Sequence, residues 1–413
     1  MNYKNKKVGI IGYGLEGRSA EKFLKSSGAK VEILDQKISN DYLQNLERFD
    51  ILVRSAGVYP FKPEIIKAKD KGIRVTSPTH IFFDEFPGQV IGVTGTKGKG
   101  TTSTLIYKIL KNAGLDVYLA GNIGLPTLDI LPKLKQNSVV VLEMSSFQLI
   151  DLPVSPNIAV VLNITTDHLD WHKDLKEYFN SKMNIVKHQN PSNWAVINSE
   201  YRNSLNFAKH TKANIIYFHK KLLDPVYTKK LILRGQHNLE NIAAAVAVAK
   251  IMQVKKDIIL KTVARFKGLE HRLEFVTKLD GVSYYNDSFA TGPDATIAAI
   301  KSFSQPKTVI LGGSDKGLNY DKLIDVINSD ANIVNVILIG QVGQMLKSKF
   351  DNKRINIFNM GVSSMGEIVK KAISISKKGS VVLLSPAAAS FDMFKDYKDR
   401  GNQFKSTVKK FKV

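Results

Sequence analysis

Short apolar runs alternate with amphipathic segments along most of the chain. Residues 7–11 and 31–34 are predicted strands, and residues 14–27 between them carry apolar side chains at helical spacing. Further strands are predicted at 51–53 and 74–76. A strand–helix rhythm of this kind is typical of a parallel sheet covered by helices, so we predict an α/β fold.

The rhythm continues through three consecutive units, and we place the predicted domains at 1–88, 89–267 and 268–413. The second unit opens with a strand at 90–93, a glycine-rich loop and a helix at 99–112. Its later predicted elements are strands at 139–142, 159–163 and 195–198 and an alanine-rich helix at 239–251. The third unit has predicted strands at 282–286, 308–311, 336–339 and 381–384. A length of 413 residues agrees with three domains of ordinary size.

Composition narrows the possible chemistry. The absence of cysteine excludes disulfides, thiolate-bound metals and a catalytic thiol. A net charge of +23 fits nucleic-acid binding, but the lysines are scattered and no nucleic-acid motif is present. The charge fits better with a lysine-rich surface or an enzyme that handles polyanionic nucleotides. Because the apolar runs are too short for a membrane helix or a signal peptide, we expect a cytoplasmic protein without membrane insertion.

The loop Gly92-Val-Thr-Gly-Thr-Lys-Gly-Lys-Gly-Thr-Thr102 lies between a predicted strand and a predicted helix. Backbone N–H groups and the helix dipole form an anion site at such a turn. Lys99 can reach terminal phosphates, and Thr101 is our candidate for a hydroxyl on Mg²⁺. Because Gly100 follows Lys99, the loop departs from the strict G-x-x-x-x-G-K-[ST] pattern.

Two further residues fit nucleotide chemistry. Glu143 follows the strand 139–142 and supplies a carboxylate of the kind that Mg²⁺ prefers. His168, in Asp167-His-Leu-Asp170, comes shortly after the strand 159–163 and is a candidate functional histidine.

A second glycine-rich turn, Gly12-Tyr-Gly-Leu-Glu-Gly17, follows the first strand, and Asp35 stands 18 residues after Gly17. Taken alone, this is a dinucleotide fingerprint and favours an NAD-dependent dehydrogenase. Together with the phosphate loop it favours an enzyme that binds ATP and a nucleotide-linked substrate, because the fingerprint specifies a pyrophosphate and not nicotinamide.

The order of these motifs resembles the Mur ligase family over essentially the whole chain. The matching segments are residues 95–101, 121–126, 143–149, 167–168, 235–241, 268–272, 286–288, 311–313 and 384–387. The segments near 121, 145, 270 and 286 favour the branch that adds D-glutamate over the branches that add L-alanine, diaminopimelate or D-alanyl-D-alanine. They also favour it over the related folylpolyglutamate synthetases.

The resemblance implies three α/β domains: a Rossmann-like N-terminal domain, a P-loop-type central ATPase domain and a Rossmann-like C-terminal domain. It implies a ligase that uses ATP to add D-glutamate to UDP-N-acetylmuramoyl-L-alanine through an acyl phosphate. This reaction belongs to peptidoglycan synthesis, and hence to cell wall biogenesis, cell shape and cell division. We expect a monomer with no nucleic-acid partner. The alternative is a related ligase that uses another acceptor or L-glutamate.

The resemblance also assigns residues to ATP and metal. The ATP-binding residues would be Gly95, Thr96, Lys97, Gly98, Lys99, Gly100, Thr101, Asn238, Asn241, Arg272 and Asp287. Two Mg²⁺ ions are expected, with Thr101 and Glu143 on the first and His168 on the second. Lys182 aligns with a lysine that the family carbamylates, so the implied catalytic residues are Lys99, Glu143, His168 and Lys182.

The other two substrates would be bound by the remaining motifs. The UDP-substrate residues would be Leu15, Asp35, Ser55, Gly57, Asn122 and Gln148. The glutamate residues would be Thr291, Lys316, Ser390, Phe391 and Tyr397. The stretch at 286–292 departs from the family pattern, because Phe289 replaces a lysine and Gly292 an asparagine. Either another cation compensates or the pocket contacts differ.

Overall fold

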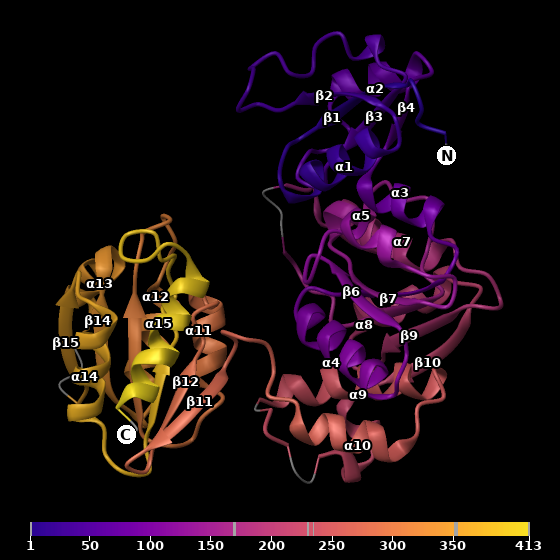
Figure 1. Ribbon diagram of the computed structural model, residues 1–413. Helices are drawn as coiled ribbons and strands as arrows, with labels where there is room; N and C mark the ends of the chain where they lie inside the picture. The colour runs from indigo at the N-terminus through magenta and orange to yellow at the C-terminus, as the bar shows by residue number, and fades with distance from the viewer. Residues whose placement is uncertain (1, 168–170, 229–230, 234, 351–353, 412–413) are drawn as a thin grey trace. The chain divides into compact units, whose positions relative to one another are not determined.

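The computed structural model describes residues 2–167, 171–228, 231–233, 235–350 and 354–411, and three β-sheets form within these ranges (Figure 1). The described chain packs as two compact units. The first unit contains residues 1–231 and 237–266, and the second contains residues 232–236 and 267–413. The predicted α/β class with three sheets is confirmed, while the exact domain boundaries stay a prediction.

The first unit begins with a four-stranded parallel sheet of order β2-β1-β3-β4. Its strands are β1 (Lys7–Ile11), β2 (Lys30–Leu34), β3 (Ile51–Arg54) and β4 (Arg74–Thr76). Its helices are α1 (Leu15–Ser26), α2 (Pro63–Asp70) and α3 (Pro78–Glu85). The chain therefore passes from β1 through a glycine-rich turn directly into α1.

A six-stranded parallel sheet of order β10-β9-β8-β5-β7-β6 completes the first unit. Its strands are β5 (Gln89–Thr94), β6 (Val117–Gly121), β7 (Val139–Glu143), β8 (Ile158–Val161), β9 (Trp194–Asn198) and β10 (Asn214–Phe218). Its helices are α4 (Lys99–Asn112), α5 (Thr127–Ile130), α6 (Ser146–Leu149), α7 (Leu175–Lys187), α8 (Arg202–Leu205), α9 (Gln236–Ile251) and α10 (Lys256–Arg265). The strand order reverses beside β5, and ligands of open α/β sheets bind at such a switch point.

One apolar core joins the two sheets of this unit. Ile10 and Val53 of the first sheet belong to the same buried cluster as Leu142 and Val161 of the second. Phe82 of α3 lies in this cluster, so α3 bridges the two sheets. Because burial of apolar surface favours the packed state, the two sheets form one packed unit.

The second unit is a six-stranded sheet of order β11-β12-β16-β13-β14-β15, in which only the β11–β12 pair is antiparallel. Its strands are β11 (Glu274–Leu279), β12 (Val282–Asn286), β13 (Lys307–Gly312), β14 (Ile333–Ile339), β15 (Asn356–Gly361) and β16 (Val381–Leu384). Its helices are α11 (Pro293–Ile300), α12 (Asp321–Ser329), α13 (Gly340–Leu346), α14 (Met365–Ile375) and α15 (Tyr397–Lys410). Residues of α11, α12 and α13 cover one face and residues of α14 and α15 the other.

None of the described helices is long and apolar enough to span a bilayer.

Candidate active site

The phosphate loop lies between β5 and α4, at the switch point of the central sheet. Gly98 precedes the helix with φ +89°, a left-handed conformation that side chains rarely adopt. A Cβ on Gly98 would lie 2.3 Å from Oδ1 of Asn241. Glycine is therefore required both by the backbone and by the space. The turn therefore leads directly into the N-terminal end of α4, where backbone N–H groups and the helix dipole favour an anion.

The side chain of Lys99 lies back over this loop. Its Nζ donates hydrogen bonds to the carbonyl oxygens of Gly95, at 2.9 Å, and Thr96, at 3.0 Å. Thr96 is fixed in turn, because its Oγ1 lies 2.9 Å from the hydroxyl of Tyr178 and donates to the carbonyl of Thr165. The predicted cation is thus placed at the turn where phosphate oxygens would lie.

Lys182 of α7 reaches the same turn. It is 2% exposed, and its Nζ donates to the carbonyl of Gly95 at 3.1 Å. Burial holds the pKa of Lys182 well below its usual value, and repulsion from Lys99 lowers it further. The charges of Asp167 and Glu143 act in the opposite direction. Burial and the charge of Lys99 together therefore favour a neutral Lys182 amine, and the two carboxylates oppose them.

The predicted metal residues lie at neighbouring element ends. Glu143 ends β7, is buried, and stands opposite Val93 in the parallel β5–β7 pair. Thr101 lies in the first turn of α4 and is half-buried. His168 lies outside the described residues. Within the described part of the chain, no three His, Asp or Glu side chains cluster closely enough to hold a metal by themselves. A hydroxyl and a carboxylate remain oxygen donors of the type that Mg²⁺ uses together with phosphate.

The asparagines of α9 face the phosphate loop. Asn241 accepts a hydrogen bond from the Thr102 hydroxyl at 3.2 Å and donates one to Oδ1 of Asn238 at 2.8 Å. Both asparagines are buried. The structure therefore brings this predicted pair to the N-terminal end of α4, next to Gly98.

The second glycine-rich turn lies between β1 and α1. Asp35 follows β2, and its carboxylate accepts hydrogen bonds from the backbone N–H groups of Tyr13, at 2.6 Å, and Lys37, at 2.9 Å. The bonds from Lys37 and then Tyr13 lower the pKa of Asp35. Ser55 donates to the carbonyl of Gly12 at 2.6 Å. Three of the predicted UDP-substrate residues, Asp35, Ser55 and the exposed Leu15, thus surround one turn.

Gln148 is committed to bonds within the protein. Its side-chain oxygen accepts from the backbone of Ser145 at 2.9 Å, and its nitrogen donates to Glu16 at 2.6 Å. Asn122 is exposed, and its backbone N–H donates to the carbonyl of Glu143 at 3.1 Å. Sequence reasoning missed Glu16, although it stands inside the glycine-rich motif between Leu15 and Gly17.

In the second unit, Asp287 follows β12 and is buried. Its carboxylate accepts from the hydroxyl of Ser385 at 2.7 Å and from the backbone N–H of Leu273 at 3.1 Å. Burial outweighs these bonds and raises the pKa of Asp287 to about 7. This carboxyl group therefore titrates near neutral pH.

Phe289, which stands where the family pattern has a lysine, is part of an aromatic cluster. The Arg272 guanidinium lies 3.9 Å from the ring centroid of Phe289, and the Phe289 ring meets that of Tyr397 at 5.0 Å. Arg400, which sequence reasoning missed, is fully buried and donates to the carbonyls of Ser288 and Ala389. Arg400 thereby fixes the backbone on either side of this cluster.

The remaining predicted glutamate residues also follow the carboxyl ends of strands in this sheet. An isolated bridge pairs Ser314 with Ala389, which places the segment carrying the exposed Lys316 beside Ser390. Ser390 is buried, whereas Phe391 is 74% exposed. Thr291 is half-buried in the turn before α11.

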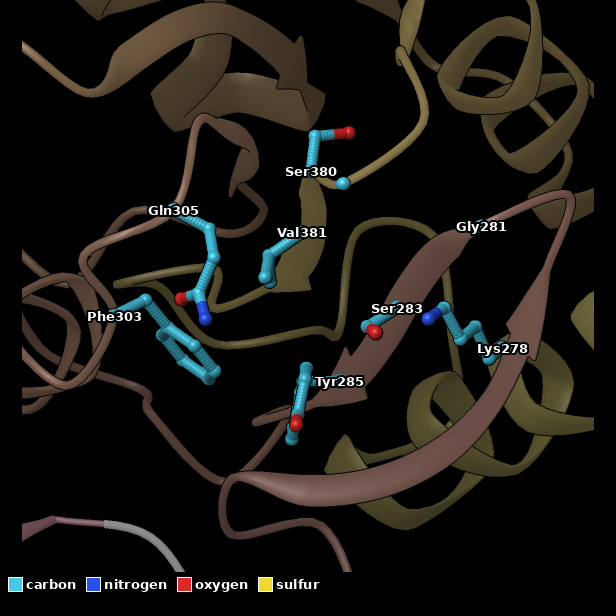
Figure 2. A pocket seen from close by; sticks show the side chains of 9 residues that line it. Lys278, Gly281, Ser283, Tyr285, Phe303, Gln305, Ser380 and Val381 are labelled. Atoms are coloured by element: carbon cyan, nitrogen blue, oxygen red, sulfur yellow. The ribbon is translucent and has the colours of Figure 1, made fainter.

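A cavity of about 210 Å³ lies near the amino ends of two central strands of this sheet (Figure 2). It is lined by residues at the beginnings of β12 and β16, including Ser283 and Val381, with Phe303 and Tyr285 as aromatic walls. Asp287 and Ser385 lie beyond the carboxyl ends of the same two strands. The cavity is therefore separate from the predicted glutamate residues.

Comparison with known proteins places the chain in a family. The Mur ligase middle domain matches residues 93–230, and the Mur ligase glutamate ligase domain matches residues 271–388. The chain is 36% identical to UDP-N-acetylmuramoylalanine–D-glutamate ligase of Acetivibrio thermocellus, with 98% of this chain and 96% of that relative covered. The chain belongs to the Mur ligase family. It is an ATP-dependent enzyme that forms an amide bond, and the dehydrogenase alternative is wrong.

Other Mur ligases support this placement. The enzyme of the same name from Clostridium botulinum strain Langeland is 34% identical, with 98% of this chain and 97% of the relative covered. Among solved structures, MurF ligase of Thermotoga maritima in complex with ADP has a TM-score of 0.61 at 20% identity, covering 99% of this chain and 96% of that one. MurC of T. maritima has a TM-score of 0.60 at 18% identity, covering 98% and 99%. These two structures share the fold of this Mur ligase.

Proposed function

We propose that this Mur ligase joins D-glutamate to UDP-N-acetylmuramoyl-L-alanine in peptidoglycan precursor synthesis. The observation that carries the proposal is identity of 34–36% over nearly the full length of relatives that are named for this reaction. We also propose that it acts as a cytoplasmic monomer, because both substrates are soluble metabolites and the predicted sites lie within one chain.

ATP is bound, in this proposal, at the turn between β5 and α4. Gly95, Gly98 and Gly100 would present backbone N–H groups, while Lys97 and Lys99 would supply the cations. Thr96 would contribute by shaping the turn, because its own N–H donates to the carbonyl of Asn163 at 2.7 Å. The converging bonds of Lys99 and Lys182 on Gly95 support this assignment. Asn238 and Asn241 would contact adenine, and the family motifs assign Arg272 and Asp287 to ATP as well.

Thr101 and Glu143 would hold one Mg²⁺ ion and His168 a second, since hydroxyl, carboxylate and imidazole are all ligands of divalent cations. When bound, Mg²⁺ neutralises charge on the transferring phosphoryl group. The burial of Glu143 at the switch point supports its part in this set. The fit at His168 rests on the motif alone.

Lys182 is proposed to be carbamylated. A neutral amine attacks the carbon of CO₂ and loses a proton, so that a lysine becomes an anionic carbamate. The depressed pKa of Lys182 supplies the neutral amine, and its burial between Gly95 and the Tyr178 ring would shield the product from water. The carbamate would then organise cations beside Lys99.

The UDP-substrate would contact Leu15, Asp35, Ser55 and Gly57 at the first sheet and Asn122 at the second. We propose that Gln148 acts by orienting Glu16, because its amide is already bonded to Glu16 and Ser145. Thr291, Lys316, Ser390, Phe391 and Tyr397 would form the glutamate pocket. Lys316 is the cation proposed to pair with a substrate carboxylate.

The chemistry that these residues serve has two bond exchanges. An oxygen of the alanyl carboxylate attacks the γ-phosphorus of ATP, the bond to the β,γ-bridging oxygen breaks, and ADP leaves. The neutral amine of D-glutamate then attacks the acyl carbon, loses a proton, and displaces phosphate to leave the amide. Cations at Lys99 and Lys97 offset the repulsion between the two anions in the first exchange.

Phosphate release with UDP-N-acetylmuramoyl-L-alanine and ATP tests the proposal, with D-glutamate, L-glutamate and other amino acids supplied in parallel. We expect turnover with D-glutamate and at least about a hundredfold less with L-glutamate, since a misplaced amine loses the orientation needed for attack. Equal turnover with L-glutamate, or turnover only with a folate acceptor, contradicts the proposal.

A further inference from the structure

Arg54 is a buried arginine that links the two sheets of the first unit. It is the last residue of β3, in the N-terminal sheet, and it is 0% exposed. A buried guanidinium is costly unless all its N–H groups are bonded and its charge is paired. The hydrogen-bond partners of Arg54 therefore show which parts of the chain it connects.

One side of the guanidinium binds the loop that follows β3. Nη1 donates to the carbonyl oxygens of Ser55, at 3.2 Å, Ala56, at 3.4 Å, and Val58, at 2.8 Å. The backbone from 55 to 58 is thereby wrapped around the charge. This loop carries Ser55 and Gly57, two of the residues proposed to meet the UDP-substrate.

The other side binds the central sheet. Nε and Nη2 form a two-point pair with the carboxylate of Asp151, at 3.1 and 2.5 Å, and Nη2 also donates to the carbonyl of Phe147 at 3.3 Å. Phe147 and Asp151 flank Gln148, in and just beyond α6. A two-point arginine–carboxylate pair fixes orientation as well as distance.

Four further bonds connect the loop to the central part, two of them through Glu16 of α1. Glu16 accepts from the backbone N–H of Ala56 at 3.1 Å and from Gln148 at 2.6 Å. Trp171 donates to the carbonyl of Gly57 at 3.2 Å. The Tyr59 hydroxyl donates to Glu177 of α7 at 2.6 Å. The loop 55–59 is therefore bonded both to elements of the first sheet and to the central part.

We propose that Arg54 is a positioning residue that sets where the UDP-substrate's carboxylate lies relative to the phosphate loop. This inference rests on the proposed function. In the proposed function, the uridine part binds at the N-terminal sheet and ATP at the central sheet. The alignment of the substrate carboxylate with the γ-phosphorus then depends on the contacts that Arg54 makes between the two sheets. Arg54 touches neither reacting group.

The test compares Arg54→Lys and Asp151→Asn with wild type in full steady-state kinetics and in ADP binding with magnesium. Lysine keeps the charge but loses the two-point pair. We expect kcat/KM for the UDP-substrate to fall about tenfold to a hundredfold in Arg54→Lys, the size of effect that a misplacement of about 1 Å produces. In Asp151→Asn, kcat/KM for the UDP-substrate should also fall, but by a smaller factor. ADP affinity should stay within about twofold of wild type in both variants, because the phosphate loop is unchanged.

Arg74→Lys is the matched control, since Arg74 lies in the same sheet and pairs with Asp84 at 3.1 Å on the surface. Its kcat/KM for the UDP-substrate and its ADP affinity should match those of wild type. Thermal unfolding is recorded for every variant, and if Arg54→Lys does not fold, Asp151→Asn decides alone. Lowered melting temperatures with unchanged kcat/KM, or ADP affinity lost in parallel, overturn the inference. A wild type without D-glutamate-dependent phosphate release contradicts the proposed function instead.

Discussion

Two glycine-rich turns in this Mur ligase have the same backbone plan and opposite side-chain charge. Each follows a strand of a parallel sheet and opens a helix, α1 in one case and α4 in the other. The α4 turn carries Lys97 and Lys99 and is approached by Lys182. The α1 turn carries Glu16, and its Tyr13 N–H is taken by Asp35.

The difference shows that the backbone provides an anion site while the side chains decide how much negative charge it accepts. A triphosphate needs several cations, and the central turn supplies them. At the first turn two carboxylates already use backbone donors, which suits a ligand recognised through hydroxyl and N–H groups as well as phosphate. This difference supports the proposal that ATP binds at the central turn and the uridine part at the first.

The largest effect is expected from Lys99→Ala. Loss of the cation that offsets charge on the transferring phosphoryl group should lower kcat by about a thousandfold or more. Binding of the UDP-substrate, measured by calorimetry, should be unchanged. Lys111→Ala, at the far end of α4, serves as the control and should retain activity. If Lys99→Ala turned over normally, the assignment of ATP to this turn would be wrong.

A smaller loss is expected from Gly98→Ala, which should raise the KM for ATP by about tenfold to a hundredfold. The new methyl group would meet Asn241 at 2.3 Å, in a backbone with φ +89°. Gly114→Ala is a close control, because Gly114 has φ +85° with nothing within 4 Å of the added atom. It should cost about 1 kcal/mol of stability and leave the KM for ATP unchanged. Equal KM values in the two variants would show that the clash does not matter.

Lys316→Ala extends the comparison to the third sheet. If each substrate has its own cation, this variant should raise the KM for D-glutamate about tenfold, the cost of one charge-assisted hydrogen bond, and leave the KM for ATP unchanged. Lys322→Ala, an exposed lysine on α12, is the control. An effect confined to ATP would mean that Lys316 serves the nucleotide and that the glutamate pocket lies elsewhere.

The smallest expected effect concerns pH. Asp35 has a lowered pKa in the folded protein, so its contribution to stability is present above its unfolded pKa of about 3.9 and is lost as the pH falls through the lower folded value. Because the group is partly exposed to solvent, this contribution should be below about 1 kcal/mol. In Asp35→Asn, the free energy of unfolding should therefore depend less steeply on pH below about pH 4 than it does in wild type. If the free energy of unfolding fell equally steeply below about pH 4 in Asp35→Asn and in wild type, this contribution of Asp35 would be contradicted.

Local patterns were sufficient to predict much of the architecture. Residues 99–112 were expected as a helix and form α4 with the same bounds, because a glycine turn and amphipathic spacing mark both its start and its length. The strands β6, β10, β11 and β15 were not predicted. Each has few fully buried residues, and β15 has none. Polar residues interrupt β11 and β15, whereas β6 and β10 contain the short apolar runs 117–120 and 215–218, which sequence reasoning missed.

The candidate site was predictable where its residues are consecutive. The turn at 95–101 and the strand end at Glu143 follow from local sequence, and Lys182 was indicated only by resemblance. Arg54 and Asp151 are 97 residues apart, and neither lies in a motif. Their pairing depends on how two sheets pack, which no local pattern encodes.

The most direct test of the account is isotope transfer from the acceptor into phosphate. UDP-N-acetylmuramoyl-L-alanine labelled with ¹⁸O in both carboxylate oxygens is turned over with ATP and D-glutamate, and the released phosphate is analysed by mass spectrometry. We expect one ¹⁸O atom in each phosphate released, because a carboxylate oxygen becomes the bridge of the acyl phosphate. Phosphate without ¹⁸O would contradict transfer of the γ-phosphoryl group from the central turn to this carboxylate.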